Sequence, residues 1–443
     1  MCFARKEIKE ELFKKVKKIP SNIIFFIGLT IIFPLVDSVN GFLLSSHINL
    51  PIGILYRSFY FLYLLIAIFS YGFPRNFYTF LTMQCLLGCF LIILFQNVVL
   101  QNPSSLLVSD LVTIIKFSLW LLIPYYIYQR REKFRNINYS NLFLVVSLFL
   151  VLGLFIPYML GMGHYTYENS NAGYKGFFFA TNDITIAFMI ATIFTGRAVT
   201  LSIVNKRKWT SLFLLLLYLG LLSSLLLIST KTGVVFGVIY TIVLLINFLF
   251  FEKKIQSIYR VFMVSLFAIS IVYLIFVGKD FIIDAISGTY TRITYFYHLY
   301  DGNLIRLLTS SRSEYLKLGF QSFWEPNNPL SVLWIGFGFE YRLIHFGGAG
   351  VGGLMEMDFF DTLFGLGLIG TLLVNSVIGY FLVLSLRRKN LSTYTIALIT
   401  ILLYSFFAGH VLFSALCTTL LGLICGGIML MHTRNDQIGR GRK

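Results

Sequence analysis

Residues 279–354 read KDFIIDAISGTYTRITYFYHLYDGNLIRLLTSSRSEYLKLGFQSFWEPNNPLSVLWIGFGFEYRLIHFGGAGVGGL. This stretch is the one long polar interruption in a chain that otherwise passes from one apolar segment to the next between Ile23 and Met431. It far exceeds the usual length of a loop within a compact domain. Its tryptophan, tyrosine, phenylalanine and arginine content is that of a segment that can fold and bind, rather than that of a disordered linker. We therefore expect recognition or chemistry to be located there.

The composition predicts an integral membrane protein. Of 443 residues, 57% are hydrophobic and only 12% are charged, which is typical of a polytopic membrane chain. The net charge of +17 lies mainly in short connections between apolar segments, so it indicates topology, and we expect no nucleic-acid partner. Four of the five cysteines lie in apolar segments, and the six histidines show no metal-ligand spacing. The sequence therefore predicts neither a disulfide framework nor a metal site.

About twelve segments reach the roughly 20 apolar residues that a membrane-spanning helix needs. They are 22–44, 51–71, 77–100, 105–128, 141–161, 181–196, 209–229, 232–251, 260–278, 358–385, 391–408 and 410–431. The predicted fold is thus an all-α polytopic membrane protein in three parts. Residues 1–278 carry transmembrane helices 1–9, residues 279–357 form a long loop between helices 9 and 10, and residues 358–443 carry helices 10–12.

The basic residues in the connections predict the orientation. Basic residues recur in every second connection, at 14–18, 75, 130–135, 206–208, 253–254, 387–389 and 434–443. The intervening connections carry few basic residues, Lys175 and Lys231 among them. Because cytoplasmic connections are enriched in Lys and Arg, both termini are predicted to be cytoplasmic and 279–357 to be extracytoplasmic.

The long loop shows internal order. Aromatic and aliphatic residues recur at helical spacing over 290–300, which predicts an amphipathic helix at the membrane interface. The pattern Ser311-x-x-Glu314 is typical of a capping box, and it predicts a second helix that runs to about Trp324. A glycine-rich stretch at 347–353 then leads into a group of carboxylates at the start of the tenth span.

Several ionisable residues lie at or inside the predicted spans, where a charge is costly and needs a partner or a function. On the predicted topology one group shares the outer half: Asp183, Lys231, Arg312, Glu356, Asp358 and Asp361. Three more lie deeper: Arg57, Asp110 and Lys116. Cations beside carboxylates at one depth suit the binding of a phosphorylated lipid together with proton transfer.

Each of these residues also has a structural interpretation. Carboxylates such as Glu356 and Asp358 suit the first turn of a helix, and Asp183 could cap its span. Lys231 could extend to the membrane surface. The deeper residues could form internal ion pairs. Arg312 has the weakest structural interpretation, because a cation at a helix start opposes the helix dipole.

Three motifs in this order resemble those of the O-antigen ligase and polymerase superfamily, which includes the Wzy-type polymerases of surface polysaccharide. They are Leu227-Ile228-Ser229-Thr230-Lys231-Thr232-Gly233, then Leu308-Thr309-Ser310-Ser311-Arg312 with Trp334-Ile335-Gly336-Phe337-Gly338, and Glu356-x-Asp358-x-x-Asp361 with Gly367-Leu368-Ile369-Gly370. The likeness extends to the number of spans and the position of the long loop. The chain departs from the ligases, which often carry His at the position of Glu356 and Arg at that of Lys231. The acidic version looks more like capsule or teichuronic acid polymerases.

The resemblance implies inverting glycosyl transfer without metal or cofactor at the outer face of a bacterial cytoplasmic membrane. The donor would be a polyprenyl-pyrophosphate-linked oligosaccharide and the acceptor a second lipid-linked repeat, with polysaccharide export and chain-length proteins as further partners. Arg312 with Lys231 would stabilise the leaving pyrophosphate, and Glu356 or Asp358 would act as the base or position the acceptor. The candidates for substrate binding are Lys231, Asp361, Asp183, Lys175 and Arg57. The alternatives are a flippase for lipid-linked oligosaccharide, for which short outer loops and an internal repeat would be expected, and a ligase.

The topology can be tested by cysteine accessibility in intact cells. We expect an impermeant thiol reagent to label Gly350→Cys without lysis, and to label Arg131→Cys and Arg388→Cys only after lysis, because Lys and Arg mark the cytoplasmic connections. Labelling of Arg388→Cys in unlysed cells would overturn the orientation.

Overall fold

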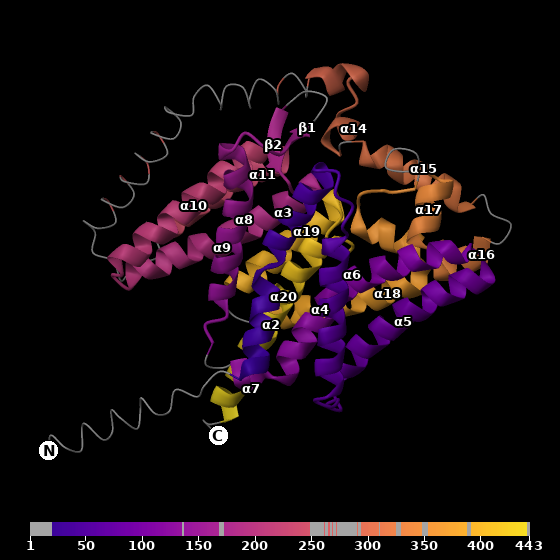
Figure 1. The fold of residues 1–443 in the computed structure, drawn as a ribbon, viewed down its shortest axis with the longest axis horizontal. Helices are drawn as coiled ribbons and strands as arrows, with labels where there is room; N and C mark the ends of the chain where they lie inside the picture. Colours follow the sequence, from indigo (N-terminus) through magenta and orange to yellow (C-terminus); the bar gives the residue numbers. More distant parts are fainter. Residues whose placement is uncertain are drawn as a thin grey trace.

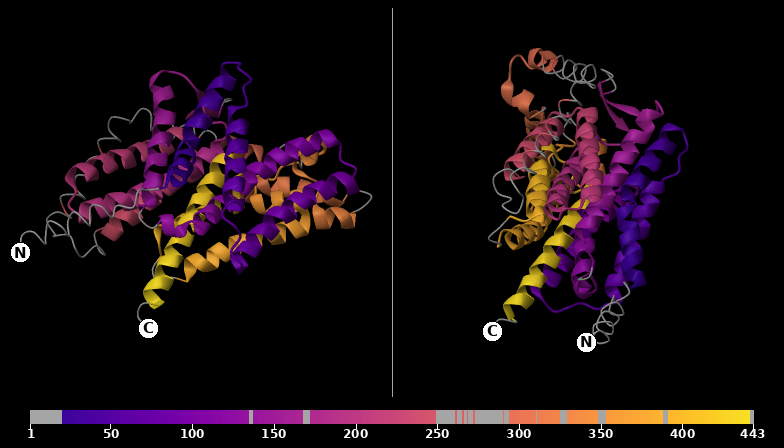
Figure 2. Two further views of the ribbon diagram at one scale, coloured as in Figure 1. Left: turned by 60° about the horizontal axis from the view of Figure 1, so that its bottom comes forward. Right: turned by 90° about the vertical axis from the view of Figure 1, so that its left-hand side faces the viewer.

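The structure is a computed structural model. It describes residues 20–134, 137–167, 172–248, 294–309, 311–324, 329–347, 353–387 and 391–440, with isolated positions at 261, 265, 268, 272 and 290. Within these residues the regular secondary structure is helical except for one antiparallel hairpin, β1 (His164–Tyr167) and β2 (Ala172–Gly176). The hairpin lies at one end of the helical bundle, and the C-terminal end of α20 lies at the other (Figure 1; Figure 2, right).

Eight helices in the described part of the chain are long and apolar enough to cross a membrane, or nine if one bent pair counts as a span. The eight are α4 (Ile52–Phe69), α5 (Phe77–Val99), α6 (Ser104–Gln129), α8 (Ser140–Met159), α9 (Thr181–Val204), α10 (Lys208–Ile228), α18 (Asp358–Leu386) and α20 (Ala415–Arg440). The bent pair is α2 (Ser21–Ile31) and α3 (Phe33–Ser45), which meet at 44°. The bend falls at Pro34 near the start of α3, where a proline ring favours a kink.

The predicted all-α membrane fold is therefore confirmed, while the count of twelve spans stays a prediction. Two shorter apolar helices, α11 (Lys231–Ile246) and α19 (Thr393–Ala408), match two further predicted spans. The predicted span at 260–278 and the glycine-rich stretch at 347–353 lie almost wholly outside the described residues. Positions 350 and 388 lie outside them too.

The bundle packs around α6. Helix α20 runs along α6, and α9 packs against α8, α10, α11 and α19 (Figure 1). The centre of α6 is buried without interruption from Phe117 to Ile127, with Trp120 fully enclosed. A helix in the middle of a bundle is apolar on all faces, which explains why the sequence of α6 shows no polar stripe at that level.

Between the spans, four short helices follow one another: α14 (Leu304–Leu308), α15 (Arg312–Trp324), α16 (Pro329–Ile335) and α17 (Phe339–His345). Helices α15, α16 and α17 lie across one side of the bundle against α5, α6 and α18, and α14 packs on α15 (Figure 1). Their apolar side chains form a small separate core around Phe323, Phe337 and Met355, which Phe364 of α18 completes. The segment is thus anchored to the bundle.

The predicted helix from residue 311 is confirmed, but the predicted capping box is wrong. Helix α15 begins at Arg312 and ends at Trp324. Ser311 has a left-handed backbone with φ of 67°, and its hydroxyl donates to the Tyr300 hydroxyl at 2.6 Å instead of capping the helix. Glu314 pairs with Arg306 at 2.6 Å. Residues 294–299 are helical, within the helix predicted at 290–300.

Glycines allow the chain before α17 to meet α18 at close range. Helix α18 is broken at Gly367, where φ is 68°. The amides of Phe337 and Gly338 donate to the carbonyls of Phe364 and Gly365 at 2.9 and 3.0 Å. A side chain at Gly336 would meet the Gly365 backbone at 2.6 Å. The Gly-x-Gly motif at 336–338 and the Gly-x-x-Gly motif at 367–370 are therefore adjacent in space. Their backbones can approach this closely because Gly336 and Gly367 carry no side chain.

Buried carboxylates fasten the ends of α17. Asp110 of α6 accepts hydrogen bonds from the amides of Phe339 and Glu340, at 3.0 and 2.8 Å, at the start of the helix. Further along, Arg342 pairs with Asp361 of α18 at 3.1 Å, and these side chains are only 3% and 4% exposed. Both contacts connect the α14–α17 segment to membrane helices.

The buried pair provides a test of this anchoring. Arg342→Met leaves the Asp361 carboxylate buried without its cation, so we expect a loss of about 3–5 kcal/mol of stability. The control is Arg306→Met, whose pair with Glu314 is 33% and 43% exposed, so it should change stability by less than about 1 kcal/mol. Thermal unfolding of the purified variants in detergent measures both. Equal melting temperatures for the two variants would contradict the anchoring role.

Candidate functional site

A cavity of about 660 Å³ lies at the hairpin end of the bundle. The first residues of three helices line it: Thr181 of α9, Lys231 of α11 and Arg312 of α15. The last turns of α19 close another side, with Tyr404 and Ala408. Because each helix N-terminus carries unpaired amides and the positive end of a dipole, the cavity is suited to an anion.

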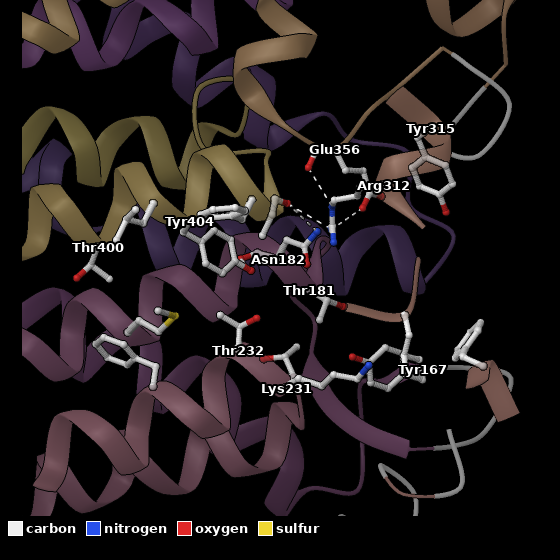
Figure 3. Close-up of a pocket in the computed structure, with 18 of the residues that line it drawn as sticks. Tyr167, Thr181, Asn182, Lys231, Thr232, Arg312, Tyr315, Glu356, Thr400 and Tyr404 are labelled. Carbon is white, nitrogen blue, oxygen red and sulfur yellow. Dashed lines mark hydrogen bonds and ion pairs between the residues drawn. The ribbon is translucent and has the colours of Figure 1, made fainter. Parts of the chain in front are cut away.

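The lining divides into a polar and an apolar part. The polar residues are Tyr167, Thr181, Asn182, Thr230, Lys231, Thr232, Tyr300, Arg312, Tyr315, Glu356, Thr400 and Tyr404. The apolar residues are Met189, Phe236, Phe296, Leu307, Leu403, Phe407 and Ala408. Figure 3 shows Arg312 and Lys231 on opposite walls, with Thr181 and Asn182 between them. A ligand between these walls would meet a cation on each side.

The wall that carries Lys231 is a tight turn between α10 and α11, as the sequence predicted. Ser229 has a left-handed backbone with φ of 57°, and the Thr230 hydroxyl caps α11 by accepting from the Gly233 amide at 3.3 Å. The same hydroxyl lies 3.1 Å from that of Thr185 on α9. A side chain at Gly233 would meet the Thr230 hydroxyl at 2.7 Å. Lys231 is therefore held at the cavity by a short and well-packed turn.

The opposite wall is an ion pair. Arg312 Nη2 lies 2.7 Å from Glu356 Oε2, and Arg312 Nε donates to the Glu356 carbonyl at 3.1 Å. Two weaker contacts, at 3.5 Å, reach the carbonyls of Thr309 and Ala408. The side chains of Arg312 and Glu356 are 12% and 27% exposed. The pair is thus shielded but still open to the cavity.

A histidine completes this pair. His410, in the turn between α19 and α20, places Nε2 4.0 Å from the other oxygen of Glu356, Oε1. Burial opposes its protonation, but the nearby Glu356 carboxylate and the charges of Asp183 and Asp358 raise the pKa of His410 to about 9. Burial would also raise the pKa of Glu356, but His410 and Arg312 outweigh it and lower that pKa below its ordinary value. At neutral pH one carboxylate therefore lies between two cations.

Asp358 holds the turn that carries His410. Its Oδ2 accepts from the Ser405 hydroxyl at 2.6 Å and from the amides of Val411 and Leu412 at 2.9 and 3.3 Å. Gly409 has φ of 65°, and a side chain there would meet the Glu356 backbone at 2.3 Å. The turn is therefore pressed against the segment before α18 and fixed in place.

Three of the residues predicted from sequence meet at the cavity: Lys231, Arg312 and Glu356. The other predicted residues are not among the described lining. Asp358 is 1% exposed and Asp361 is 3% exposed, and the contacts given above engage Asp361 and one oxygen, Oδ2, of Asp358. Asp183 lies beside the cavity, where it accepts from the Ser414 hydroxyl.

Arg57 and Lys175 lie elsewhere. Arg57 of α4 pairs with Asp37 of α3 and donates to the Gly53 carbonyl at 2.9 Å, which matches the internal ion pair considered for it. Lys175 lies in β2, half-buried, and does not line the cavity as described.

Sequence reasoning missed His410 and Arg342. The available signal for His410 was a lone histidine at the start of the predicted span 410–431, on the same predicted side as Lys231, and Arg342 gave none beyond its place in the long loop.

The described residues contain no group of three or more His, Cys, Asp or Glu side chains placed to hold a metal ion. Comparison of the chain with known protein families and with curated proteins finds no match. The chemistry of the site must therefore be argued from its own residues.

The raised pKa of His410 predicts a pH-dependent stability. Protonated His410 stabilises the fold fully below its unfolded pKa of 6.5, and this contribution is lost as the pH rises through about 9. We expect His410→Asn to lower stability by about 1–3 kcal/mol near neutral pH, since Asn tolerates the left-handed backbone at this position, where φ is 62°. The difference in melting temperature between wild type and variant should shrink above about pH 9. A difference that stays constant across that range would contradict a charged histidine.

Proposed function

We propose that this chain polymerises polyprenyl-pyrophosphate-linked oligosaccharide repeats into a surface polysaccharide at the outer face of a bacterial cytoplasmic membrane. The observation that carries the proposal is the cavity with Lys231 and Arg312 on opposite walls, three helix N-termini around it, and an apolar part beside them. This combination suits a ligand with a polyanionic group attached to a hydrocarbon chain.

The cationic part supports a pyrophosphate ligand. Lys231 and Arg312 each occupy the first residue of a helix, where a cation is disfavoured by roughly 0.3–1 kcal/mol. An anion between them removes this penalty and gains charge-assisted hydrogen bonds from both. Hydroxyl groups of Thr181, Thr232 and Tyr315 line the same space and can donate to phosphate or sugar oxygens. The opposed cations match a group that carries two phosphates.

The apolar part supports a lipid attached to that pyrophosphate. Phe236 of α11 and Leu403 and Phe407 of α19 line the cavity. Leu403 is 55% exposed and Phe407 is 65% exposed on an apolar helix. In a membrane such side chains face hydrocarbon, so the cavity opens towards the bilayer between α11 and α19. A polyprenyl chain could enter along this side while its headgroup reaches the cations.

The reaction that fits is glycosyl transfer with inversion. An acceptor sugar hydroxyl attacks the anomeric carbon of the donor, and a new glycosidic C–O bond forms as the bond to the pyrophosphate oxygen breaks. Polyprenyl pyrophosphate leaves with the electron pair, and Arg312 and Lys231 stabilise its growing charge. The hydroxyl proton passes to the Glu356 carboxylate, the acid in the described lining. Asp358, whose oxygen is taken up by Ser405 and two amides, acts through the turn that it holds.

The resemblance of three motifs to the Wzy-type polymerases favours a polymerase over the two alternatives. A ligase would use the same donor but pass finished glycan to a different acceptor. A flippase would bind the same lipid and move it across the membrane without forming a bond. The three activities differ in which intermediate accumulates when the site fails.

Arg312 provides the test. Arg312→Ala should abolish long polysaccharide while single lipid-linked repeats accumulate on the outer face, because the leaving pyrophosphate loses its bidentate donor. Arg312→Lys keeps the charge but not the planar fork, so we expect only partial rescue. Extracted lipid-linked glycans and polymer length are measured in cells, with the purified protein and purified lipid-linked repeats as the direct assay.

The matched control is Arg306→Ala, which removes a half-buried arginine from the same segment outside the described cavity lining. It should leave polymer length unchanged. Repeats that accumulate on the inner face in Arg312→Ala cells would indicate a flippase. Accumulated polymer that is not transferred to its final acceptor would indicate a ligase, and normal long polymer would remove Arg312 from the site.

A further inference from the structure

Arg312 has two incompatible tasks in the proposed function. In the structure its Nη2 and Nε both bind Glu356, through the side chain at 2.7 Å and the backbone at 3.1 Å. A pyrophosphate that binds in a bidentate manner to the Nε–Nη2 edge of the guanidinium would compete for the same two donors. If the ligand takes them, Glu356 is left as a shielded carboxylate without that cation, and an unpaired buried charge costs several kcal/mol. Something must compensate Glu356 when the donor lipid binds.

The geometry supplies a second cation on the far side of the same carboxylate. Arg312 faces Glu356 Oε2, while His410 Nε2 lies 4.0 Å from Glu356 Oε1. This separation is longer than a hydrogen bond. His410 is therefore close enough to attract the carboxylate but is not hydrogen-bonded to it while Arg312 binds Glu356. A small movement of the carboxylate towards His410 would close that distance and lengthen the contact to Arg312.

We propose that His410 is a positioning residue that takes over the Glu356 carboxylate when an anionic lipid headgroup draws Arg312 away. Binding of the donor and release of Glu356 from Arg312 are then one event, so the carboxylate becomes available to the acceptor hydroxyl only when the donor is in place. This inference rests on the proposed function, and it adds a residue and an order of events to it.

The exchange requires that the His410 side of the Glu356 carboxylate is rigid and that the Arg312 side can move. The turn that carries His410 is fixed by the three hydrogen bonds to Asp358 and by the close approach of Gly409 to the Glu356 backbone. The remaining contacts of Arg312, to the carbonyls of Thr309 and Ala408, are both 3.5 Å long. The arginine can therefore turn towards a ligand, while the histidine stays where it is.

The charged groups around His410 keep it cationic during the exchange. Asp183 faces it from α9, Asp358 from α18, and Glu356 from the segment before α18. Arg312 of α15 reaches Ala408, two residues before it. Three carboxylates against one arginine favour the imidazolium, and they are the cause of the raised pKa of His410, about 9. Support from His410 should be present below that pH and be lost as the pH rises through it.

The experiment measures binding of farnesyl pyrophosphate, a short prenyl pyrophosphate, to the purified full-length protein in detergent between about pH 7 and pH 10. The variants are His410→Asn, which removes the charge, and His410→Lys, which restores it. The matched control is His47→Asn, because His47 also has a left-handed backbone, with φ of 59°, but is exposed in the connection between α3 and α4. Affinities are expressed as ratios to wild type at each pH, which cancels the titration of the ligand itself.

We expect His410→Asn to weaken binding about tenfold near neutral pH, with the ratio approaching one above about pH 9. His410→Lys should recover most of the affinity, and His47→Asn should match wild type throughout. A His410→Asn ratio near one at every pH, or a loss of the same size at neutral and high pH, would overturn the role of His410 and leave the proposed function standing. Failure of the wild type to bind the prenyl pyrophosphate at any pH would overturn both.

Discussion

Two buried carboxylates, three residues apart in the first turn of α18, hold the candidate site together. Asp361 binds Arg342 of α17 and accepts from the amides of Met355 and Met357 at 3.0 and 3.1 Å. Asp358 binds the turn between α19 and α20. One carboxylate therefore fixes the chain on both sides of Glu356, and the other fixes the turn that carries His410. Asp361 and Asp358 together therefore place Glu356 between its two cations.

The need for these carboxylates follows from the backbone around them. The chain is irregular before α18 and in the turn between α19 and α20, and Glu356 itself has φ of 55°. Irregular backbone near a membrane leaves amides that no helix satisfies, so side chains must accept from them. Aspartates at the start of a helix are well placed to do so, because they also face the positive end of its dipole. Asp358 and Asp361, which look catalytic in the sequence, are thus required for the fold. Glu356 is the acid of this group that lines the described cavity.

The sequence predicts the parts of this arrangement that depend on local pattern. The bounds of most spans and of α15 follow from hydrophobic runs and periodicity, and they match the described helices closely. Lys231, Arg312 and Glu356 were identified because ionisable groups near spans are rare. The distinct roles of Glu356, Asp358 and Asp361 could not be separated, since a first-turn position suits capping and catalysis equally. Arg342 and His410 could not be found, because their partners lie far away in the sequence and only the packing of α17 and α20 on α18 brings them together.

The site is also organised so that its own electrostatics favour a ligand. Lys231 and Arg312 begin helices α11 and α15, where each opposes a dipole, and α9 adds a third positive helix end. The cavity therefore gathers two cations and three positive helix ends, with Glu356 as the carboxylate in the described lining. A headgroup with two phosphates would relieve repulsion on both walls at once, whereas a single negative charge would relieve only one. The proposed function fits this arrangement, because a lipid-linked pyrophosphate carries more than one negative group for the two cations on opposite walls and a hydrocarbon chain for the apolar side formed by α11 and α19.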